Sequence, residues 1–229
     1  MLLEGIFNMK KSVLITGSSR GLGRELAIVF ANNDYDVVLH GRDKVNLYRV
    51  KEDISKYSVK CSLLCGDLRA SQTLDALYNI SRENRLSVLI NNAGVALESG
   101  LEKMDDQQIE EILTTNLSAT IKLTRRLYTL FLKFGGGTII NINSILGKES
   151  SELKSVYCAS KCGLRGFTNA FRLEAQKNNV RVIEVYPTRI KTKPEYTYGM
   201  EPLDVARKIY DTFTKTSLDE LILDNRFVG

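Results

Sequence analysis

The sequence of 229 residues contains no tryptophan, one histidine and four cysteines, and it has no long apolar run. A membrane-spanning helix needs about 20 consecutive apolar residues, so no membrane span is predicted. The cysteines form two C-x-x-x-C pairs, 61/65 and 158/162, whose spacing differs from that of common zinc ribbons, and the single histidine, His40, accompanies neither pair. We therefore predict no metal site. The cysteines are interpreted as reduced, packing thiols, with a redox role for Cys158 and Cys162 as the alternative.

Charge of one sign is not concentrated in any stretch of the chain. There are 32 basic and 27 acidic residues, a net charge of +5, and no long basic run, which argues against a nucleic-acid partner. Residues 1–11, MLLEGIFNMKK, lack the basic start of a signal peptide and are interrupted by Glu4, so an N-terminal extension is expected instead. Together with the reduced cysteines, these features favour a cytoplasmic protein.

Apolar runs of strand length alternate with helical patterns along the chain. The runs lie at 12–16, 36–40, 60–65, 87–90, 137–142, 180–186 and 220–223. The helical patterns lie at 21–32, 43–56, 71–84, 102–134 with a break near 115, 155–178 and 201–215. This alternation predicts the α/β class, as a single Rossmann-type doubly wound domain over 1–229. We expect a seven-stranded parallel sheet of order 3-2-1-4-5-6-7 with helices on both faces and a ligand crevice at the carboxyl ends of the strands.

A glycine-rich turn joins the first strand to the first helix. The run 12–16 leads into TGSSRGLG, which contains Gly17, Gly21 and Gly23. Residues without a Cβ let the backbone approach a pyrophosphate closely, and the start of a helix presents free N–H groups and a positive dipole end. The spacing G-x-x-x-G-x-G differs from the commoner G-x-G-x-x-G. We interpret the turn as a dinucleotide phosphate site, with an ordinary strand-to-helix turn as the alternative.

Tyr157 and Lys161 lie four residues apart in a helical stretch, and Ser144 lies thirteen positions before the tyrosine, at the end of a strand run. Positions i and i+4 share one face of a helix, so the phenol and the ammonium are expected side by side. A nearby cation favours phenolate and lowers the tyrosine pKa from about 10. Tyr157 is therefore a candidate proton donor for a reaction that uses the predicted nucleotide.

The glycine turn and the Tyr-x-x-x-Lys pair together resemble the short-chain dehydrogenase/reductase family, and the resemblance covers about residues 12 to 224. In the same order as in that family, Asn91-Asn92-Ala93-Gly94 follows the fourth apolar run, Asn116 lies in LTTNLSAT, and Pro187 follows the sixth run. Thr188 stands where the family has glycine, and its side chain is expected to crowd the nicotinamide slightly.

The resemblance implies four catalytic residues. Tyr157 would donate the proton, and Ser144 would hold the substrate oxygen. Lys161 would lower the tyrosine pKa and hold the nicotinamide ribose, and Asn116 would steady a water that passes protons to Lys161. From the residues alone, the alternatives are a strand-end cap for Ser144 and a helix N-cap for Asn116. Asp67 resembles the family's adenine-contacting acid, with a helix N-cap as the alternative. The implied cofactor-binding residues are Gly17, Ser19, Arg20, Gly21, Leu22, Gly23, Gly41, Arg42, Asp67, Leu68, Asn92, Ala93, Gly94, Tyr157, Lys161, Pro187, Thr188, Ile190 and Thr192.

The end of the second strand indicates which nucleotide is expected. An acid at this point binds the ribose 2′-hydroxyl of NAD. Here Gly41 occupies that position and Arg42 follows, with a planar donor group suited to a 2′-phosphate. Arg20 of the glycine turn adds a second cation. We predict NADP(H), with NAD(H) as the alternative if Arg42 is a solvated loop residue and Asp43 binds the ribose.

The sequence therefore predicts an NADP(H)-dependent oxidoreductase that interconverts a carbonyl and a secondary alcohol of a small molecule. The alternatives are an NAD-dependent alcohol dehydrogenase and a catalytically silent NADP-binding regulatory protein. By resemblance, the helical regions 102–134 and 155–178 favour a homodimer or homotetramer. Only KPEYTYGM separates Thr192 from the next helix, so a short flap is expected, in which Tyr196 and Tyr198 either line the substrate pocket or pack.

Overall fold

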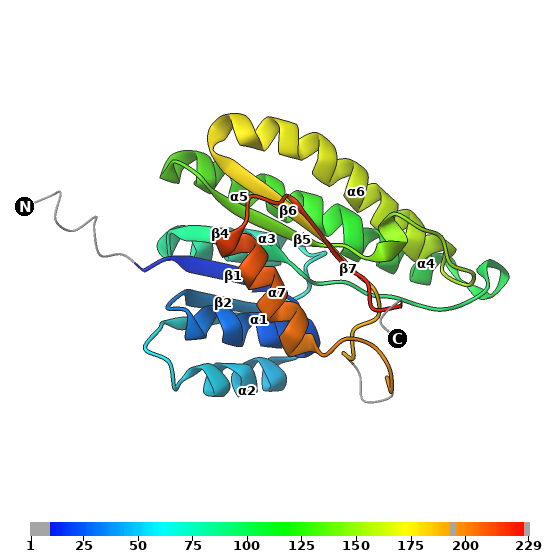
Figure 1. Cartoon of the computed structure of the whole chain (residues 1–229), viewed down its shortest axis with the longest axis horizontal. Coiled ribbons are helices and arrows are strands. Elements are labelled where there is room, and N and C mark those ends of the chain that lie inside the picture. The colour runs from blue at the N-terminus through cyan, green and yellow to red at the C-terminus, as the bar shows by residue number, and fades with distance from the viewer. Residues whose placement is uncertain (1–9, 193–195, 227–229) are drawn as a thin grey trace, which may run out of the picture.

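The computed structural model describes residues 10–192 and 196–226, so most of the expected N-terminal extension lies outside the described residues. The strands form one parallel sheet of order β3-β2-β1-β4-β5-β6-β7, which confirms the predicted topology (Figure 1). The strands are β1 (Ser12–Thr16), β2 (Asp36–Gly41), β3 (Cys61–Cys65), β4 (Leu86–Asn91), β5 (Gly137–Ile142), β6 (Val180–Pro187) and β7 (Glu220–Leu223).

Helices join the strands and cover both faces of the sheet. The α-helices are α1 (Gly21–Asn32), α2 (Lys44–Ile54), α3 (Ser71–Glu83), α4 (Asp106–Leu113), α5 (Ala119–Phe134), α6 (Ser155–Ala175) and α7 (Pro202–Lys215). Short turns are η1 (Leu101–Lys103), η2 (Thr114–Ser118), η3 (Ile145–Gly147) and η4 (Gln176–Asn178). Each predicted range agrees with the structure to within a few residues.

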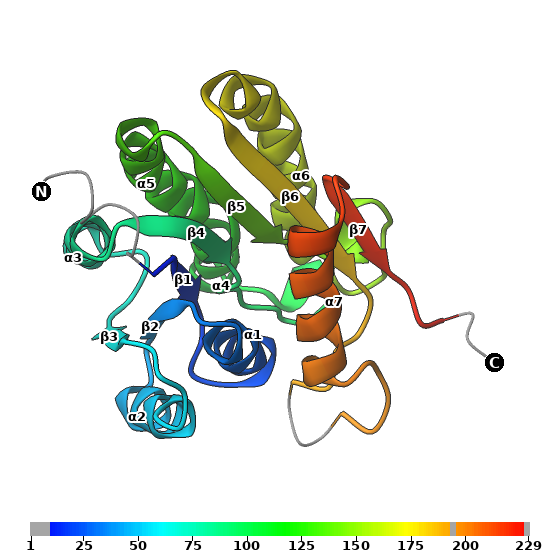
Figure 2. The same cartoon turned by 60° about the vertical axis from the view of Figure 1, so that its left-hand side comes forward.

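The core lies in two layers on opposite faces of the sheet. One apolar cluster joins α1, α2 and α7 to the sheet through Phe30, Leu47 and Ile209. The other joins α3, α5 and α6 through residues that include Leu77 and Phe131. Figure 2 shows these two sets of helices on either side of the strands. Because the side chains of a buried parallel strand pack on both faces, its sequence is apolar throughout and does not alternate.

The break expected near residue 115 is a π-turn within a continuous helix. At η2 the Ala119 N–H bonds to the Thr114 carbonyl, five residues back, and α5 follows directly. Such single π-turns are rare and are found frequently at functional sites. This one contains Asn116, which the sequence had singled out.

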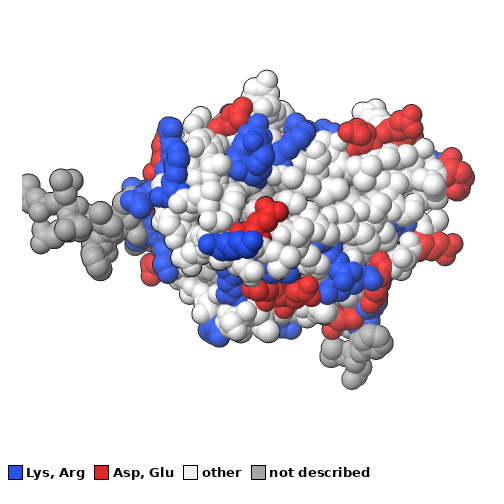
Figure 3. Space-filling model, turned by 90° about the horizontal axis from the view of Figure 1, so that it is seen from above, with Lys and Arg blue, Asp and Glu red and all other residues white. Residues whose placement is uncertain are grey.

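Lys and Arg are interspersed with Asp and Glu on the face drawn in Figure 3. No helix in the part of the chain that the structure describes has the length and apolar content of a membrane span.

Candidate active site

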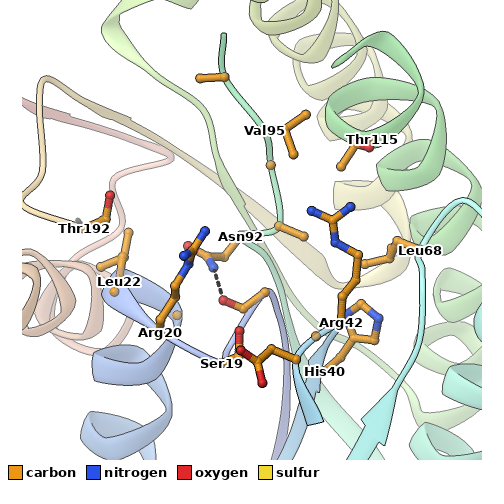
Figure 4. Close-up of a pocket in the computed structure, with 18 of the residues that line it drawn as sticks. Ser19, Arg20, Leu22, His40, Arg42, Leu68, Asn92, Val95, Thr115 and Thr192 are labelled. Atoms are coloured by element: carbon orange, nitrogen blue, oxygen red, sulfur yellow. Dashed lines mark hydrogen bonds between the residues drawn. The ribbon is translucent and has the colours of Figure 1, made fainter. Parts of the chain in front are cut away.

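A cavity of about 800 Å³ opens at the carboxyl ends of the central strands. Figure 4 shows Arg20 and Arg42 reaching into it from two sides, with Leu22, Asn92 and Thr192 around it. This is the edge where a doubly wound sheet binds its ligand. Most of the predicted cofactor residues line it: Gly17, Ser19, Arg20, Gly21, Leu22, Gly23, Gly41, Arg42, Asp67, Leu68, Asn92, Ala93, Gly94 and Thr192. Asp43 and Tyr196, named above in alternative roles, also line it, and the sequence missed the remaining lining residues, namely His40, Val95, Ala96 and Thr115.

The glycine turn is a backbone cradle that has no room for side chains. Gly17 has φ +67°, in the left-handed region, and a Cβ there would lie 2.9 Å from Ala93 Cα. A Cβ on Gly23 would overlap the Gly17 carbonyl oxygen and lie 2.6 Å from Asn92 Nδ2. The open backbone at the start of α1 therefore fits a pyrophosphate, whose charge the helix N-terminus favours.

Two side chains fix the cradle to the loop after β4. Asn92 Nδ2 donates to the carbonyls of Thr16 at 2.9 Å and of Gly17 at 3.1 Å. Thr16 Oγ1 accepts from the N–H groups of Asn92 and Ala93, each at 3.0 Å. The glycine turn and the Asn-Asn-Ala-Gly segment, 75 residues apart in the sequence, are thus one hydrogen-bonded unit.

Arg42 and Asp67 of the cavity wall belong to a chain of charges that the sequence revealed only in part. Arg42 Nη1 lies 3.3 Å from Glu111 Oε1 of α4, and the Arg42 side chain is 57% exposed. Arg69 donates to Asp67 through Nη2 at 2.6 Å and Nε at 3.0 Å. Arg69 also lies 4.0 Å from Glu111. Because exposed pairs of this kind contribute at most about 1 kcal/mol, a phosphate can displace the carboxylate from Arg42.

Asp43 and Asp67 line the cavity, and both carboxylates have hydrogen-bond partners within the protein. Asp43 Oδ1 accepts from the Asn46 N–H at 3.0 Å and caps α2, which holds its pKa below the ordinary value. The N-cap of α3 is Ala70, without a side-chain hydrogen bond, so Asp67 is not that cap. The Arg69 contacts lower the pKa of Asp67, which is therefore ionised at pH 7.

His40 is a structural strand residue. It is 2% exposed, and its Nε2 lies 3.1 Å from the Gly66 carbonyl oxygen. Burial lowers its pKa to about 4. The imidazole is therefore neutral at pH 7, and Nε2–H donates to Gly66.

The structure brings Ser144, Tyr157 and Lys161 together beside the cavity. The hydroxyls of Tyr157 and Ser144 share a hydrogen bond, and Tyr196 of the cavity wall lies near Tyr157. Lys161 Nζ lies 5.8 Å from the centre of the Tyr157 ring. Ser144 Oγ also accepts from the Leu146 N–H at 3.2 Å, so Ser144 caps the turn η3 as well as facing the phenol.

The expected lowering of the tyrosine pKa was wrong for this geometry. Burial raises the pKa of Tyr157 to about 12, although the Ser144 hydrogen bond acts in the opposite direction. Lys161 Nζ donates to the Ile142 carbonyl at 2.9 Å, below the ring. Burial lowers the pKa of Lys161 itself to about 8, so this 5%-exposed lysine is mainly an ammonium at pH 7.

Asn116 links the loop after β4 to α6. Its Oδ1 accepts from the Val95 N–H at 2.8 Å, and its Nδ2 donates to the Val95 carbonyl at 2.9 Å and to Ser160 Oγ at 3.0 Å. The residue is 1% exposed and lies inside the π-turn, so it is not a helix N-cap. A Cβ on Gly94 would lie 3.2 Å from Asn116 Oδ1, which explains glycine at that position.

The side chain of Thr188, just after β6, contacts the C-terminal segment after β7. Thr188 Oγ1 donates to Asn225 Oδ1 at 2.6 Å and lies 3.3 Å from the Leu223 carbonyl, so its side chain does not crowd the cavity as expected. Pro187, Thr188 and Ile190 do not line the cavity, and their cofactor role stays a prediction.

Residues 193–195 of the expected flap lie outside the described residues. Arg189 lies over the rings of Tyr196 and Tyr198, at 5.2 Å and 4.3 Å.

All four cysteines are free thiols. Cys162 Sγ lies 3.8 Å from the Leu146 carbonyl oxygen. Burial raises the pKa of Cys61 to about 11, which makes it a poor nucleophile. A redox role for Cys158 and Cys162 stays a prediction.

A parallel sheet in this strand order, with a glycine cradle and a hydroxyl, a phenol and an ammonium beside the cavity, defines a Rossmann-type oxidoreductase. The family model described as short chain dehydrogenase matches residues 11–198. The chain belongs to this family of oxidoreductases.

Individual relatives agree with that assignment. A sepiapterin reductase of Chlorobaculum tepidum is 30% identical over 94% of this chain and 96% of its own. An NADP-dependent 3-hydroxy acid dehydrogenase of Schizosaccharomyces pombe is 33% identical over 80% and 73%. A metagenomic short-chain oxidoreductase, solved in complex with NADP, is 28% identical with a TM-score of 0.84 and covers 94% of this chain and 97% of its own.

Proposed function

We propose that this protein interconverts a carbonyl and a secondary alcohol of a small molecule with NADP(H), using Tyr157 as the general acid and base. The observation that carries the proposal is the meeting of Ser144, Tyr157 and Lys161 from β5 and α6 beside the cavity that contains the glycine cradle. Relatives named as NADP-dependent or solved with NADP support the choice of nucleotide.

NADP(H) is the cofactor that the cavity fits, with its pyrophosphate at the cradle and its 2′-phosphate near Arg42 and Arg20. When bound, it supplies or accepts the hydride at the substrate carbon. Ser144 holds the substrate oxygen by a hydrogen bond, and Tyr157 donates a proton to it. The Lys161 ammonium stabilises the phenolate that this transfer leaves, and the same cation holds the nicotinamide ribose.

Asn116 is proposed to hold the active-site backbone in place. Both N–H donors of its side chain are used by Val95 and Ser160. A water that passes protons to Lys161 must therefore donate to the amide oxygen or contact the backbone of the π-turn. The proton-relay role of Asn116 stays a prediction. The single domain also stays a prediction. The homodimer or homotetramer stays a prediction too; on the two helices expected to form its interface, Leu132 of α5 and Leu173 of α6 are exposed.

The test is NADPH oxidation by the purified protein over a panel of sugars, steroid-like ketones, acyl thioesters and quinones. We expect turnover with at least one class of carbonyl. If NADPH binds but no member of the panel is reduced, and no matching alcohol is oxidised with NADP, the catalytically silent alternative is favoured.

Replacing Arg42 with alanine is expected to weaken NADP(H) binding about 10- to 100-fold while leaving NAD(H) binding nearly unchanged. A hydrogen bond to a charged group contributes about 1.5–3 kcal/mol, and only NADP(H) carries the 2′-phosphate that would lose it. Titration of both nucleotides measures the effect. The control is Arg49→Ala, which removes the same charge from the exposed face of α2. Equal weakening of both nucleotides, or tighter binding of NAD than NADP by the unmodified protein, contradicts the assignment.

A further inference from the structure

A fully buried carboxylate lies behind the catalytic residues. Glu184 interrupts the apolar run of β6, is 0% exposed and is in register with Asn141 of β5. Glu184 and Tyr186 point to the same face of the sheet, because alternate residues of a strand do so. Lys161 of α6 lies on that face, since it interacts electrostatically with Glu184. An acid in the middle of a buried strand needs partners, because an unpaired buried charge is costly.

Both oxygens of Glu184 accept short hydrogen bonds. Asn143 Nδ2 donates to Oε1 at 2.6 Å, and the Tyr186 hydroxyl donates to Oε2 at 2.5 Å. Burial raises the pKa of Glu184 above its ordinary value, and these two hydrogen bonds and the charge of Arg172 oppose that rise. Hydrogen bonds that a carboxylate accepts stabilise its ionised form.

Asn143 connects this carboxylate to two catalytic residues. Its Nδ2 also donates to the Lys161 carbonyl at 3.1 Å, and its Oδ1 accepts from the Ser144 N–H at 2.8 Å. Asn143 is 3% exposed, so its amide cannot exchange these partners for solvent. The orientation of the amide is set by Glu184, because only the N–H₂ side can donate to a carboxylate.

The charges around Glu184 come from three elements. α6 contributes Lys161 and Arg172. β7 contributes Glu220, which opposes ionisation of Glu184 but is itself held by Lys148 at 2.6 Å, from just after η3. Lys148 Nζ also lies 4.2 Å from the centre of the Tyr186 ring. The negative charge of Glu184 acts on Lys161, whose Nζ also donates to the Ile142 carbonyl.

We propose that Glu184 is a positioning residue that serves as the buried counter-charge of Lys161 and, through Asn143, fixes the backbone of Lys161 and Ser144. This inference rests on the proposed function, because it explains how Lys161 remains an ammonium where that function needs one. Burial drives the Lys161 pKa down to about 8, and Glu184 opposes this fall. Without the carboxylate, the lysine loses its proton closer to neutral pH, and the phenolate of Tyr157 loses its stabilising cation.

Glu184→Gln is the sharpest variant, since it removes the charge and keeps the shape. The glutamine oxygen can accept from Asn143, and its N–H₂ can donate to the Tyr186 oxygen, so both neighbours keep a hydrogen bond to residue 184, while the Tyr186 hydroxyl proton loses its acceptor. The matched control is Glu220→Gln, the same change on neighbouring β7, where the carboxylate contacts Lys148 and not Asn143.

The first measurement is the titration of Lys161 by NMR of lysine-labelled protein, with Lys161→Met used for assignment. We expect the Lys161 pKa to fall by about one pH unit in Glu184→Gln, in line with loss of an opposite charge, and not to fall in Glu220→Gln. This readout needs no turnover, so it separates this inference from the proposed function. An unchanged Lys161 pKa in Glu184→Gln overturns the inference even if the enzyme is active.

The second measurement is the pH profile of kcat/KM for carbonyl reduction. If Lys161 sets the alkaline limb, kcat/KM of the unmodified protein should fall at about pH 8. In Glu184→Gln this limb should move about one pH unit lower. Activity at pH 6 should change less than twofold. A uniform loss at all pH values indicates a merely structural role and contradicts the inference. If Glu184→Gln does not fold, titration of Lys161 in the unmodified protein still decides, because a pKa well below 7 is incompatible with an effective counter-charge.

Discussion

Tyr157→Phe is expected to reduce kcat for carbonyl reduction by a factor of about 10²–10⁴ while NADPH binding stays within about twofold of normal. The variant removes the hydroxyl that is proposed to donate the proton and keeps the ring beside Ser144 and Lys161. General acid catalysis contributes about this factor. Steady-state rates with the best carbonyl of the panel, together with NADPH titration, measure the two effects separately.

The matched control for this variant is Tyr198→Phe. Tyr198 is 62% exposed and lies under Arg189, so loss of its hydroxyl should change kcat less than twofold. Undiminished turnover in Tyr157→Phe would remove Tyr157 from the mechanism. A parallel loss of NADPH binding would mean that the phenol holds the nucleotide and not the reacting oxygen.

Gly23→Ala is expected to weaken NADP(H) binding about 100-fold or more and to lower the free energy of unfolding by about 1–3 kcal/mol, the usual cost of forcing atoms into a packed site. The new Cβ would overlap the Gly17 carbonyl oxygen and press on Asn92 Nδ2. Because one is a backbone atom and the other is hydrogen-bonded, the cradle must open to make room. Its N–H groups then no longer point at the pyrophosphate. Nucleotide titration and urea unfolding measure the two effects.

Gly166→Ala is the control for the glycine cradle. A Cβ on Gly166, on the exposed face of α6, has nothing within 4 Å. Alanine is the better helix former by about 1 kcal/mol, so this variant should be as stable as the unmodified protein or more so, with unchanged NADP(H) binding. Normal nucleotide affinity in Gly23→Ala would show that α1 can shift without cost, which contradicts the close approach seen here.

The strand and helix order was predictable because it depends on local patterns. Apolar runs such as 12–16 and 137–142 are too short for helices and too apolar for loops, and the glycine turn separates β1 from α1 without ambiguity. The contents of the cavity followed from the same logic, since residues at the carboxyl ends of parallel strands meet at one edge. The π-turn was not predictable, because its sequence is that of an ordinary helix and its geometry depends on Asn116 bonding to Val95.

The errors concern electrostatics and partners that are distant in the sequence. Spacing placed Lys161 beside Tyr157, but burial, which no spacing reveals, raises the tyrosine pKa and lowers the lysine pKa. Thr188 was expected to face the cavity, yet Asn225, 37 residues later, accepts its hydroxyl. No motif in the sequence predicted that Arg69 and Glu111 would pair with Asp67 and Arg42 beside the cavity.

The sequence by itself determined the class of fold and the place of the glycine cradle, because both depend on periodicity and on contacts within a few residues; its resemblance to the family named the candidate active-site residues. Only the tertiary structure decided which of those residues are buried and what opposes their charge. Burial and long-range pairing arise when β5, β6 and α6 pack together. That packing buries Glu184, an acid in an apolar run, where its charge acts on Lys161 and its Oε1 accepts from Asn143.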